Sequence, residues 1–347
     1  MARTLARIGA VAVLSLAALA TGSASADDFF RGKQIRMIVG SDSGGGYDAY
    51  ARLIARHWVD FIPGRPTMIV QNLPGAGGLK SMNYIATSAP ADGTVIGAPQ
   101  NQIPFEPLLK LSGGTMENVQ FDALEANWLG SAAKEVAIAF VWHTAPVRTI
   151  EDVMKQEVVT GSSGATTSSS ISARILNATI GTKFKVVYGY KGNADMALAI
   201  ERGEVQGSAG WFYSSFVATR GQWLTEKKVR ILVQVALEKH PALPDVPLIL
   251  DYVTSDETRK ELALALSSGL IGRPYVAPAG VPASRVAILR DSFMDALQSP
   301  ALLDEAKKMH FEIDAMSGED MQTLLVEQYQ APQAMVDRVR SLLMSDK

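Results

Sequence analysis

Two glycine-rich segments of the chain carry residue types suited to binding an anionic group. They are Ser41–Gly46 and Pro74–Gly78, and each follows a short apolar run, Ile35–Val39 or Thr67–Val70. Glycine lets bare backbone N–H groups approach a ligand. A helix that begins behind such a loop adds unpaired N–H donors and a partial positive charge. The two segments therefore predict an anion-binding cradle built largely from backbone.

A third segment has the same arrangement. The apolar run Val158–Thr160 enters a loop of small residues, Gly161–Ser168, and apolar residues at helical spacing follow it. Open α/β sheets bind ligands at the carboxyl ends of their strands. We therefore expect three helix N-termini to face one cleft.

A dinucleotide site is the first alternative for these glycines. Gly44–Ala49 matches the pattern G-x-G-x-x-A directly after an expected strand. No acidic residue stands at the end of the second strand to hold a ribose, because Val70 leads into Gln71 and Asn72. We therefore favour a simple anion cradle, and we expect no cofactor.

Patterns that would indicate catalysis are weak. Ser131–Lys134 matches S-x-x-K without its companion motifs, and Gly161–Gly164 is not a nucleophile elbow because position 165 is alanine. The chain has no cysteine, and its four histidines show no metal-ligand spacing. We therefore expect a binding protein without catalytic or metal-ligating residues. An exported hydrolase built on the same loops is a less favoured alternative.

Alternating strand and helix patterns position the three loops and indicate an α/β fold with mostly parallel sheets. The expected strands are Ile35–Val39, Thr67–Val70, Thr94–Ala98, Val136–Trp142, Val158–Thr160, Phe184–Tyr188, Val205–Ala209, Val229–Val235 and Ser267–Val276. Helical patterns follow the loops and also cover 194–202, 255–266, 283–298, 300–309 and 317–345. No flexible linker is evident, so two domains would be joined by crossings of the chain, expected near 143–147 and 262–270.

The first 26 residues have the features of a secretion signal. Arg3 and Arg7 precede an apolar run, Ile8–Ala20, and Ala24–Ala26 provides a cleavage site before Asp27. The formal net charge of −2 gives no support to nucleic-acid or membrane-surface binding. We therefore expect an exported chain without a nucleic-acid partner and without direct insertion into a membrane.

Several ordered motifs resemble the exported solute-binding proteins of tripartite tricarboxylate transporters, the TctC or Bug family. The matching segments are Gly45–Asp48, Asn72–Gly78, Ala91–Thr94, Gly161–Gly164, Tyr190–Gly192, Pro241–Pro247 and Ala277–Pro282. The resemblance implies a type II periplasmic-binding-protein fold, with two α/β domains that close on a ligand between them. Residues 27–145 and 266–347 would form the first domain, and 146–265 the second.

The same resemblance implies a function. The protein would be a periplasmic receptor, expected to be a monomer, that captures a small carboxylate and delivers it to membrane permease subunits. The ligand would be a di- or tricarboxylate or an aromatic acid. A sensor subunit with the same ligand is a further alternative.

The expected ligand-binding residues come from all three loops and one aromatic segment. The two first-domain loops would hold a carboxylate, and the second-domain loop would meet the other end of the ligand. Trp211–Tyr213 would either stack on an aromatic ligand or pack in a core. The expected set is Ser41, Ser43, Gly44, Gly45, Gly46, Tyr47, Asp48, Pro74, Gly75, Ala76, Gly77, Gly78, Ser162, Ser163, Gly164, Ala165, Thr167 and Trp211.

Overall fold

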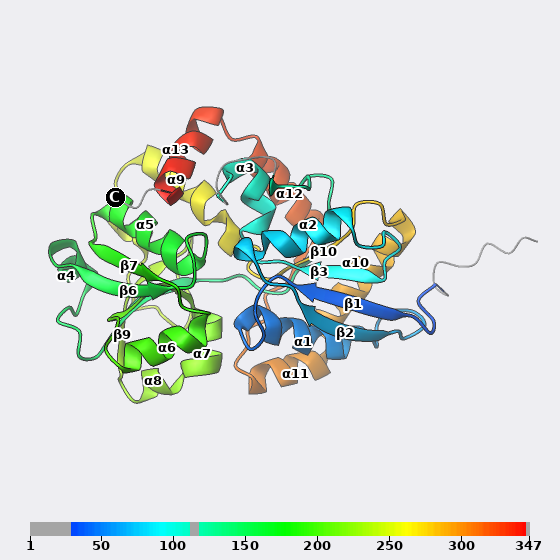
Figure 1. The fold of residues 1–347 in the computed structure, drawn as a ribbon, viewed down its shortest axis with the longest axis horizontal. Coiled ribbons are helices and arrows are strands. Elements are labelled where there is room, and N and C mark those ends of the chain that lie inside the picture. The colour runs from blue at the N-terminus through cyan, green and yellow to red at the C-terminus, as the bar shows by residue number, and fades with distance from the viewer. Residues whose placement is uncertain (1–28, 112–117, 345–347) are drawn as a thin grey trace, which may run out of the picture.

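The computed structural model describes residues 29–111 and 118–344, and the expected secretion signal at 1–26 lies outside these residues. Two β-sheets form two halves of the molecule (Figure 1). The first sheet has the strand order β11-β4-β10-β3-β1-β2 and the second β7-β6-β8-β5-β9. The strands are β1 (Gln34–Val39), β2 (Thr67–Asn72), β3 (Val95–Ala98), β4 (Asn127–Ser131), β5 (Ala137–Trp142), β6 (Val158–Ser162), β7 (Phe184–Tyr188), β8 (Gly207–Phe212), β9 (Val229–Val235), β10 (Pro274–Ala277) and β11 (Met316–Ser317).

The two sheets share one topology. In the first, β1 pairs in parallel with β2 and β3, and β10 runs antiparallel between β3 and β4. In the second, β6 pairs in parallel with β7 and β8, and β5 runs antiparallel between β8 and β9. β10 and β5 are each the first strand after the chain crosses from the other sheet, and the first sheet has one more strand, β11, at its edge. The expected α/β fold with two domains is confirmed.

The first of the two crossings does not lie where the sequence pattern placed it, whereas the second, expected near 262–270, falls within the observed return. The expected strand at Val136–Trp142 is present as β5, but β5 belongs to the second sheet. The chain therefore leaves the first sheet at 132–136 and not at 143–147. The return spans 236–273, and the long strand expected at Ser267–Val276 is reduced to β10. An apolar strand is suited to the interior of either sheet, so its pattern does not indicate which sheet it joins.

Helices cover both faces of the sheets. They are α1 (Gly46–Trp58), α2 (Leu79–Thr87), α3 (Glu106–Leu109), α4 (Ile150–Lys155), α5 (Ser168–Ile180), α6 (Asn193–Glu201), α7 (Tyr213–Arg220), α8 (Gln222–Thr225), α9 (Asp256–Leu266), α10 (Ala283–Gln298), α11 (Pro300–Lys308), α12 (Gly318–Tyr329) and α13 (Gln333–Met344). The C-terminal helix α13 packs against α5 and α9 (Figure 1). The end of the chain therefore covers a helix of the second domain.

Aromatic clusters form the core of each half. In the first, Trp58 of α1 packs against Phe293 of α10, and its indole N–H donates to Ser292 Oγ at 2.9 Å. In the second, Phe140 packs against Trp211 and Phe216. These side chains are almost fully buried. Their packing joins α1 to α10 in the first half and β5 to β8 and α7 in the second.

Candidate ligand-binding cleft

A cleft of about 750 Å³ lies between the two halves. The parallel strands of both sheets point their carboxyl ends toward it, as expected for an open α/β fold. Its lining comprises Gly40, Ser41, Asp42, Ser43, Gly44, Gly45, Gly46, Tyr47, Pro74, Gly75, Ala76, Gly77, Gln100 and Gln102 from the first half, Ser163, Thr167, Ser168, 190–195, Phe212, Ser215, Thr219 and Arg220 from the second, and Arg273 from the returning crossing.

The first glycine loop presents the N-terminus of α1 to the cleft. Gly45 is the N-cap of this helix, and no side chain caps it. The first-turn N–H groups of a helix have no partner within the helix. Those of Gly46 and Tyr47 are therefore available to an anion.

Asp48 holds this loop from behind. Its carboxylate accepts hydrogen bonds from the Gly44 N–H at 2.9 Å, from Asn72 Nδ2 at 2.9 Å and from Arg52 Nε at 3.0 Å. Asp48 is 4% exposed and does not line the cleft. It acts on the cradle by positioning, because Gly44 belongs to the first loop and Asn72 leads into the second.

The pH dependence of stability will report on Asp48. Burial alone would raise the pKa of its carboxyl, but the hydrogen bonds from Arg52, Gly44 and Asn72 outweigh burial and hold the pKa below its ordinary value of 3.8. A lowered pKa contributes stability above about pH 4 that is lost as the pH falls through the folded-state value. We expect Asp48→Asn to cost about 1.5–3 kcal/mol at neutral pH, and we expect that difference to shrink below about pH 3. Urea unfolding at both pH values measures it, and a difference that stays constant would contradict the assignment.

The second glycine loop has an unusual backbone. Gly75, Ala76, Gly77 and Gly78 all have positive φ, with values of 140°, 47°, 62° and 96°. Left-handed backbone is uncommon for a residue with a side chain, so Ala76 is strained, and such strain clusters at ligand sites. The N-cap of α2 is Gly78, and no side chain caps this helix either.

This second loop also meets the second domain across the cleft. Gln102 Nε2 lies 3.4 Å from the carbonyl oxygen of Gly77 and 3.2 Å from that of Thr166. A Cβ placed on Gly77 would lie 2.6 Å from Thr166 Oγ1. The second loop and the second-domain loop are therefore positioned to contact the same small ligand.

The second-domain loop is fixed by hydroxyl groups. Ser162 Oγ lies 2.8 Å from Ser169 Oγ and 2.6 Å from Ser170 Oγ, and the Gly164 carbonyl accepts from Thr167 Oγ1 at 2.8 Å. Ser162 is fully buried. The internal bonds of Ser162 and Gly164 hold the loop, while Ser163 and Thr167 line the cleft at the N-terminus of α5.

Most of the predicted binding residues lie at this cleft. Those that line it are Ser41, Ser43, Gly44, Gly45, Gly46, Tyr47, Pro74, Gly75, Ala76, Gly77, Ser163 and Thr167. Asp48, Gly78, Ser162, Gly164, Ala165 and Trp211 are not among its lining residues. That the lining residues contact a ligand stays a prediction.

The structure places Trp211 in the core of the second domain. The side chain is 2% exposed, and its ring packs against Phe140 and Phe216. Successive residues of a strand point to opposite faces. The next residue, Phe212, therefore points away from this core and lines the cleft. An aromatic ligand would meet Phe212 and not Trp211, which corrects the expected assignment.

The sequence pattern missed part of the lining. Gln100 and Gln102 follow β3 at the same edge as the two glycine loops, and Tyr190–Gly192 follow β7 and lead into α6. The rule that found the three loops could have found these residues too. Ser215, Thr219, Arg220 and Arg273 were also missed. Arg273 had no local signal, because a strand was expected there.

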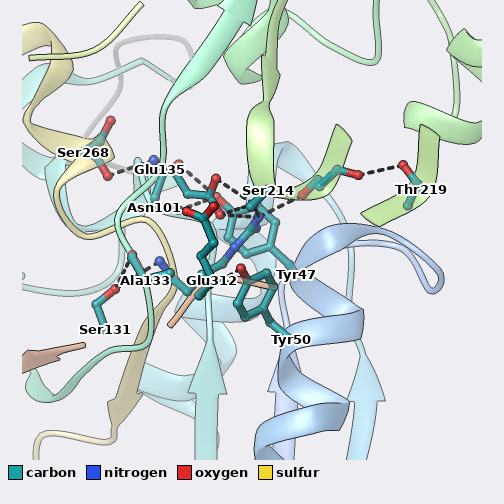
Figure 2. A network of polar contacts seen from close by, with 12 residues as sticks. Tyr47, Tyr50, Asn101, Ser131, Ala133, Glu135, Ser214, Thr219, Ser268 and Glu312 are labelled. Atoms are coloured by element: carbon teal, nitrogen blue, oxygen red, sulfur yellow. Dashed lines mark hydrogen bonds and ion pairs between the residues drawn. The ribbon is translucent and has the colours of Figure 1, made fainter. Parts of the chain in front are cut away.

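Two residues of the cleft lining, Tyr47 and Arg273, belong to a network of buried polar groups, which Figure 2 shows. Arg273 Nη2 lies 2.6 Å from Glu135 Oε1, and both side chains are 1% exposed. Ser214 Oγ donates to the same carboxylate. Tyr47 donates its hydroxyl to Asn101 Oδ1 at 2.9 Å, and burial raises the pKa of Tyr47 to about 12. Tyr47 is therefore neutral at physiological pH and adds no negative charge.

Residues 29–111 and 118–344 contain neither a candidate metal site nor a candidate transmembrane helix. No group of three or more His, Cys, Asp or Glu side chains there is arranged to hold a metal ion. No helix in these ranges has the length and apolar character to cross a bilayer.

The duplicated sheets and the cleft between them define the fold class, the two-domain periplasmic-binding-protein fold of type II. Residues 61–340 match the profile of the tripartite tricarboxylate transporter family receptors (TctC), and the chain belongs to that family. Both the resemblance and the fold class expected from the sequence are confirmed. Proteins of this family are periplasmic receptors.

Several other proteins are similar to this chain over most of its length. The UPF0065 protein of the gbd 5' region of Cupriavidus necator is 24% identical over 341 residues, covering 95% of this chain and 94% of that protein. MatC (Rpa3494) from Rhodopseudomonas palustris with bound malate has a TM-score of 0.63 and 17% identity, covering 89% of this chain and 99% of that one. Rpa4515 from R. palustris with adipate has a TM-score of 0.68 and 19% identity, covering 90% and 97%.

Proposed function

We propose that the protein captures a small carboxylate in the cleft and delivers it to membrane permease subunits of a tripartite tricarboxylate transporter. One observation carries the ligand class: the uncapped N-termini of α1 and α5 converge on the same cleft, which the glycine loop before α2 also lines. Helix N-termini supply unpaired N–H donors and a partial positive charge, so they favour an anion. Malate and adipate in the two solved relatives are acids of this kind.

The two-domain arrangement supports a ligand with polar groups at both ends. The first-domain loops and the second-domain loop lie on opposite sides of the cleft. A ligand that contacts both stabilises the closed form of the receptor, and a permease that binds this form responds to occupancy. The secretion signal at 1–26, export to the periplasm and a monomeric receptor belong to the same proposal.

Binding without catalysis is part of the proposal. No serine, lysine or histidine of the cleft lining forms a nucleophile–base pair among the described residues. The serine hydroxyls of the second-domain loop bond to one another and to a carbonyl group. Nothing there favours the hydrolase alternative. The family's description as transporter receptors favours delivery over sensing.

A thermal-shift panel tests the ligand class. A ligand that binds only the folded state at a hundredfold excess over Kd adds roughly 2.7 kcal/mol of stability. We expect a subset of about a hundred small carboxylates to raise the melting temperature, while their uncharged carboxamides have much smaller effects. Hits only among amines or neutral sugars would contradict the proposal.

A further inference from the structure

We propose that Arg273 is a specificity-determining residue of the cleft, and that its guanidinium recognises the negative charge of the ligand's acidic group. This inference rests on the carboxylate-binding function proposed above. It adds a buried, fixed cation to a cradle that otherwise consists of backbone donors.

The first observation is where Arg273 lies. It directly precedes β10, in the crossing that returns to the first sheet, and it lines the cleft although it is almost fully buried. A Cβ placed on Gly46 would lie 3.2 Å from Arg273 Nη2. The guanidinium is therefore directly beside the first residue of α1, whose N–H group belongs to the cradle.

The second observation is that the hydrogen-bonding capacity of Arg273 is only partly used. Its Nη2 atom contacts Glu135, Ser214 and Ser215, at 2.6, 3.2 and 2.9 Å. Its Nε and Nη1 atoms are buried without a hydrogen-bond partner. Buried donors in proteins are nearly always paired, so two unpaired groups on one cleft residue indicate a missing acceptor. A carboxylate is the acceptor that a guanidinium prefers.

The third observation is which groups surround the guanidinium. Its carbon lies 4.4 Å from the ring centre of Tyr47 and 5.6 Å from that of Phe212, and both rings line the cleft. Gly46 of the first domain and Ser215 of the second meet beside it so closely that a Cβ on Gly46 would collide with Ser215 Oγ. Because these two residues belong to different domains, opening of the cleft separates them and lets an acid reach the guanidinium. Closure then buries the contact.

The charges around the cleft are compatible with this role. Asp42 is exposed, and Asp195 accepts a hydrogen bond from the backbone N–H of Lys191. Lys191 and Arg220 are the other basic lining residues. Glu135 supplies the counter-charge of Arg273. It lines a neighbouring cavity of about 310 Å³, which Arg273 does not line. Arg273 is therefore the member of the pair that lines the ligand cleft.

The competing explanation is that Arg273 only braces the two crossings against each other. Removing the arginine alone would leave Glu135 as an unpaired buried charge, which is strongly destabilising. The informative variant is therefore the double substitution Glu135→Gln with Arg273→Met, which removes both charges at once. Arg273→Lys is a second variant that preserves the pairing charge but lacks the planar set of donors. Glu135→Gln alone is the matched control, since it breaks the same pair and retains the arginine.

The experiment measures Kd by calorimetry for adipate, malate, benzoate and any further acid that shifts the melting temperature, each beside its carboxamide. We expect the double variant to lose about tenfold or more in affinity for the acid and less than about threefold for the carboxamide. We expect Arg273→Lys also to lose more affinity for the acid than for the carboxamide. We expect Glu135→Gln to bind the acid at least as tightly as the unmodified protein.

Two results would overturn the inference. Unchanged acid affinity in the double variant and in Arg273→Lys would show that the cradle recognises the negative charge of the ligand without Arg273. Equal losses for acid and carboxamide in all three variants would show that the arginine is only a brace. In both cases the unmodified protein still binds acids, so the proposed function stands. If the unmodified protein binds no acid, the proposed function fails and this inference fails with it.

Discussion

The variant Gly77→Val is expected to weaken carboxylate binding by about a hundredfold or more while leaving the protein folded. Gly77 has a φ of 62°, a region that costs a residue with a side chain roughly 1–2 kcal/mol. Its added Cβ would also lie 2.6 Å from Thr166 Oγ1 of the other domain. The substitution therefore distorts the cradle and blocks closure over the ligand. Calorimetry with the best acid from the thermal-shift panel measures the loss.

Gly32→Val is the matched control for this prediction. Gly32 has a nearly identical φ of 68°, and a Cβ there would meet no atom within 4 Å. It lies just before β1, at the end of the strand far from the cleft. Both variants should lose similar stability from backbone strain, and only Gly77→Val should lose binding. Equal affinities in the two variants would show that Gly77 is not part of the binding site.

The glycine loops could be predicted from sequence because their conformation depends on residues that are close together in the chain. An apolar strand, a loop that tolerates positive φ and a helix without a capping side chain are all visible in a short window. The same reasoning places Ser163 and Thr167, since α5 begins after the same kind of loop. Gln100 and Gln102 follow the rule as well, and they were missed only because the segment after β3 is irregular.

Long-range pairing was the part that the sequence could not determine. β5 was recognised as a strand, but its partners β8 and β9 decide that it belongs to the second sheet. β4 was not predicted, because Asn127–Ser131 contains few strand-forming residues. It is a strand because it pairs with β10 and β11. The helix expected over 317–345 is divided into α12 and α13 before and after 330–332, and Pro332 in this gap cannot donate to the helical ladder.

The least predictable features of the site were single side chains at element ends. The strand expected at Val205–Ala209 extends to Phe212 in the structure, so the alternation that buries Trp211 was not visible in the predicted range. Glu135 and Arg273 lie in the two crossings, and only the tertiary structure brings them together. Their pairing nevertheless has a testable energetic consequence, separate from any ligand.

Glu135→Ala is expected to lower the free energy of unfolding by about 3–5 kcal/mol. The pair it breaks is 1% exposed on both sides, so the loss leaves a buried guanidinium without its counter-charge. It also removes the acceptor of the Ser214 hydroxyl. The packing around Glu135 is specific, because a Cβ on Gly272 would collide with the Cγ of Glu135. Urea unfolding, followed by tryptophan fluorescence, measures the change.

The matched control for Glu135→Ala is Glu226→Ala. Glu226 and Lys228 form an ion pair with the same N–O distance of 2.6 Å, but both side chains are about half exposed. Water screens such a pair, and exposed pairs contribute little to stability. We therefore expect no measurable change in the unfolding midpoint of Glu226→Ala. Adding Arg273→Met to Glu135→Ala should recover much of the lost stability, because it removes the orphaned charge. If burial did not decide the cost, the two single variants would unfold alike and the second substitution would recover nothing.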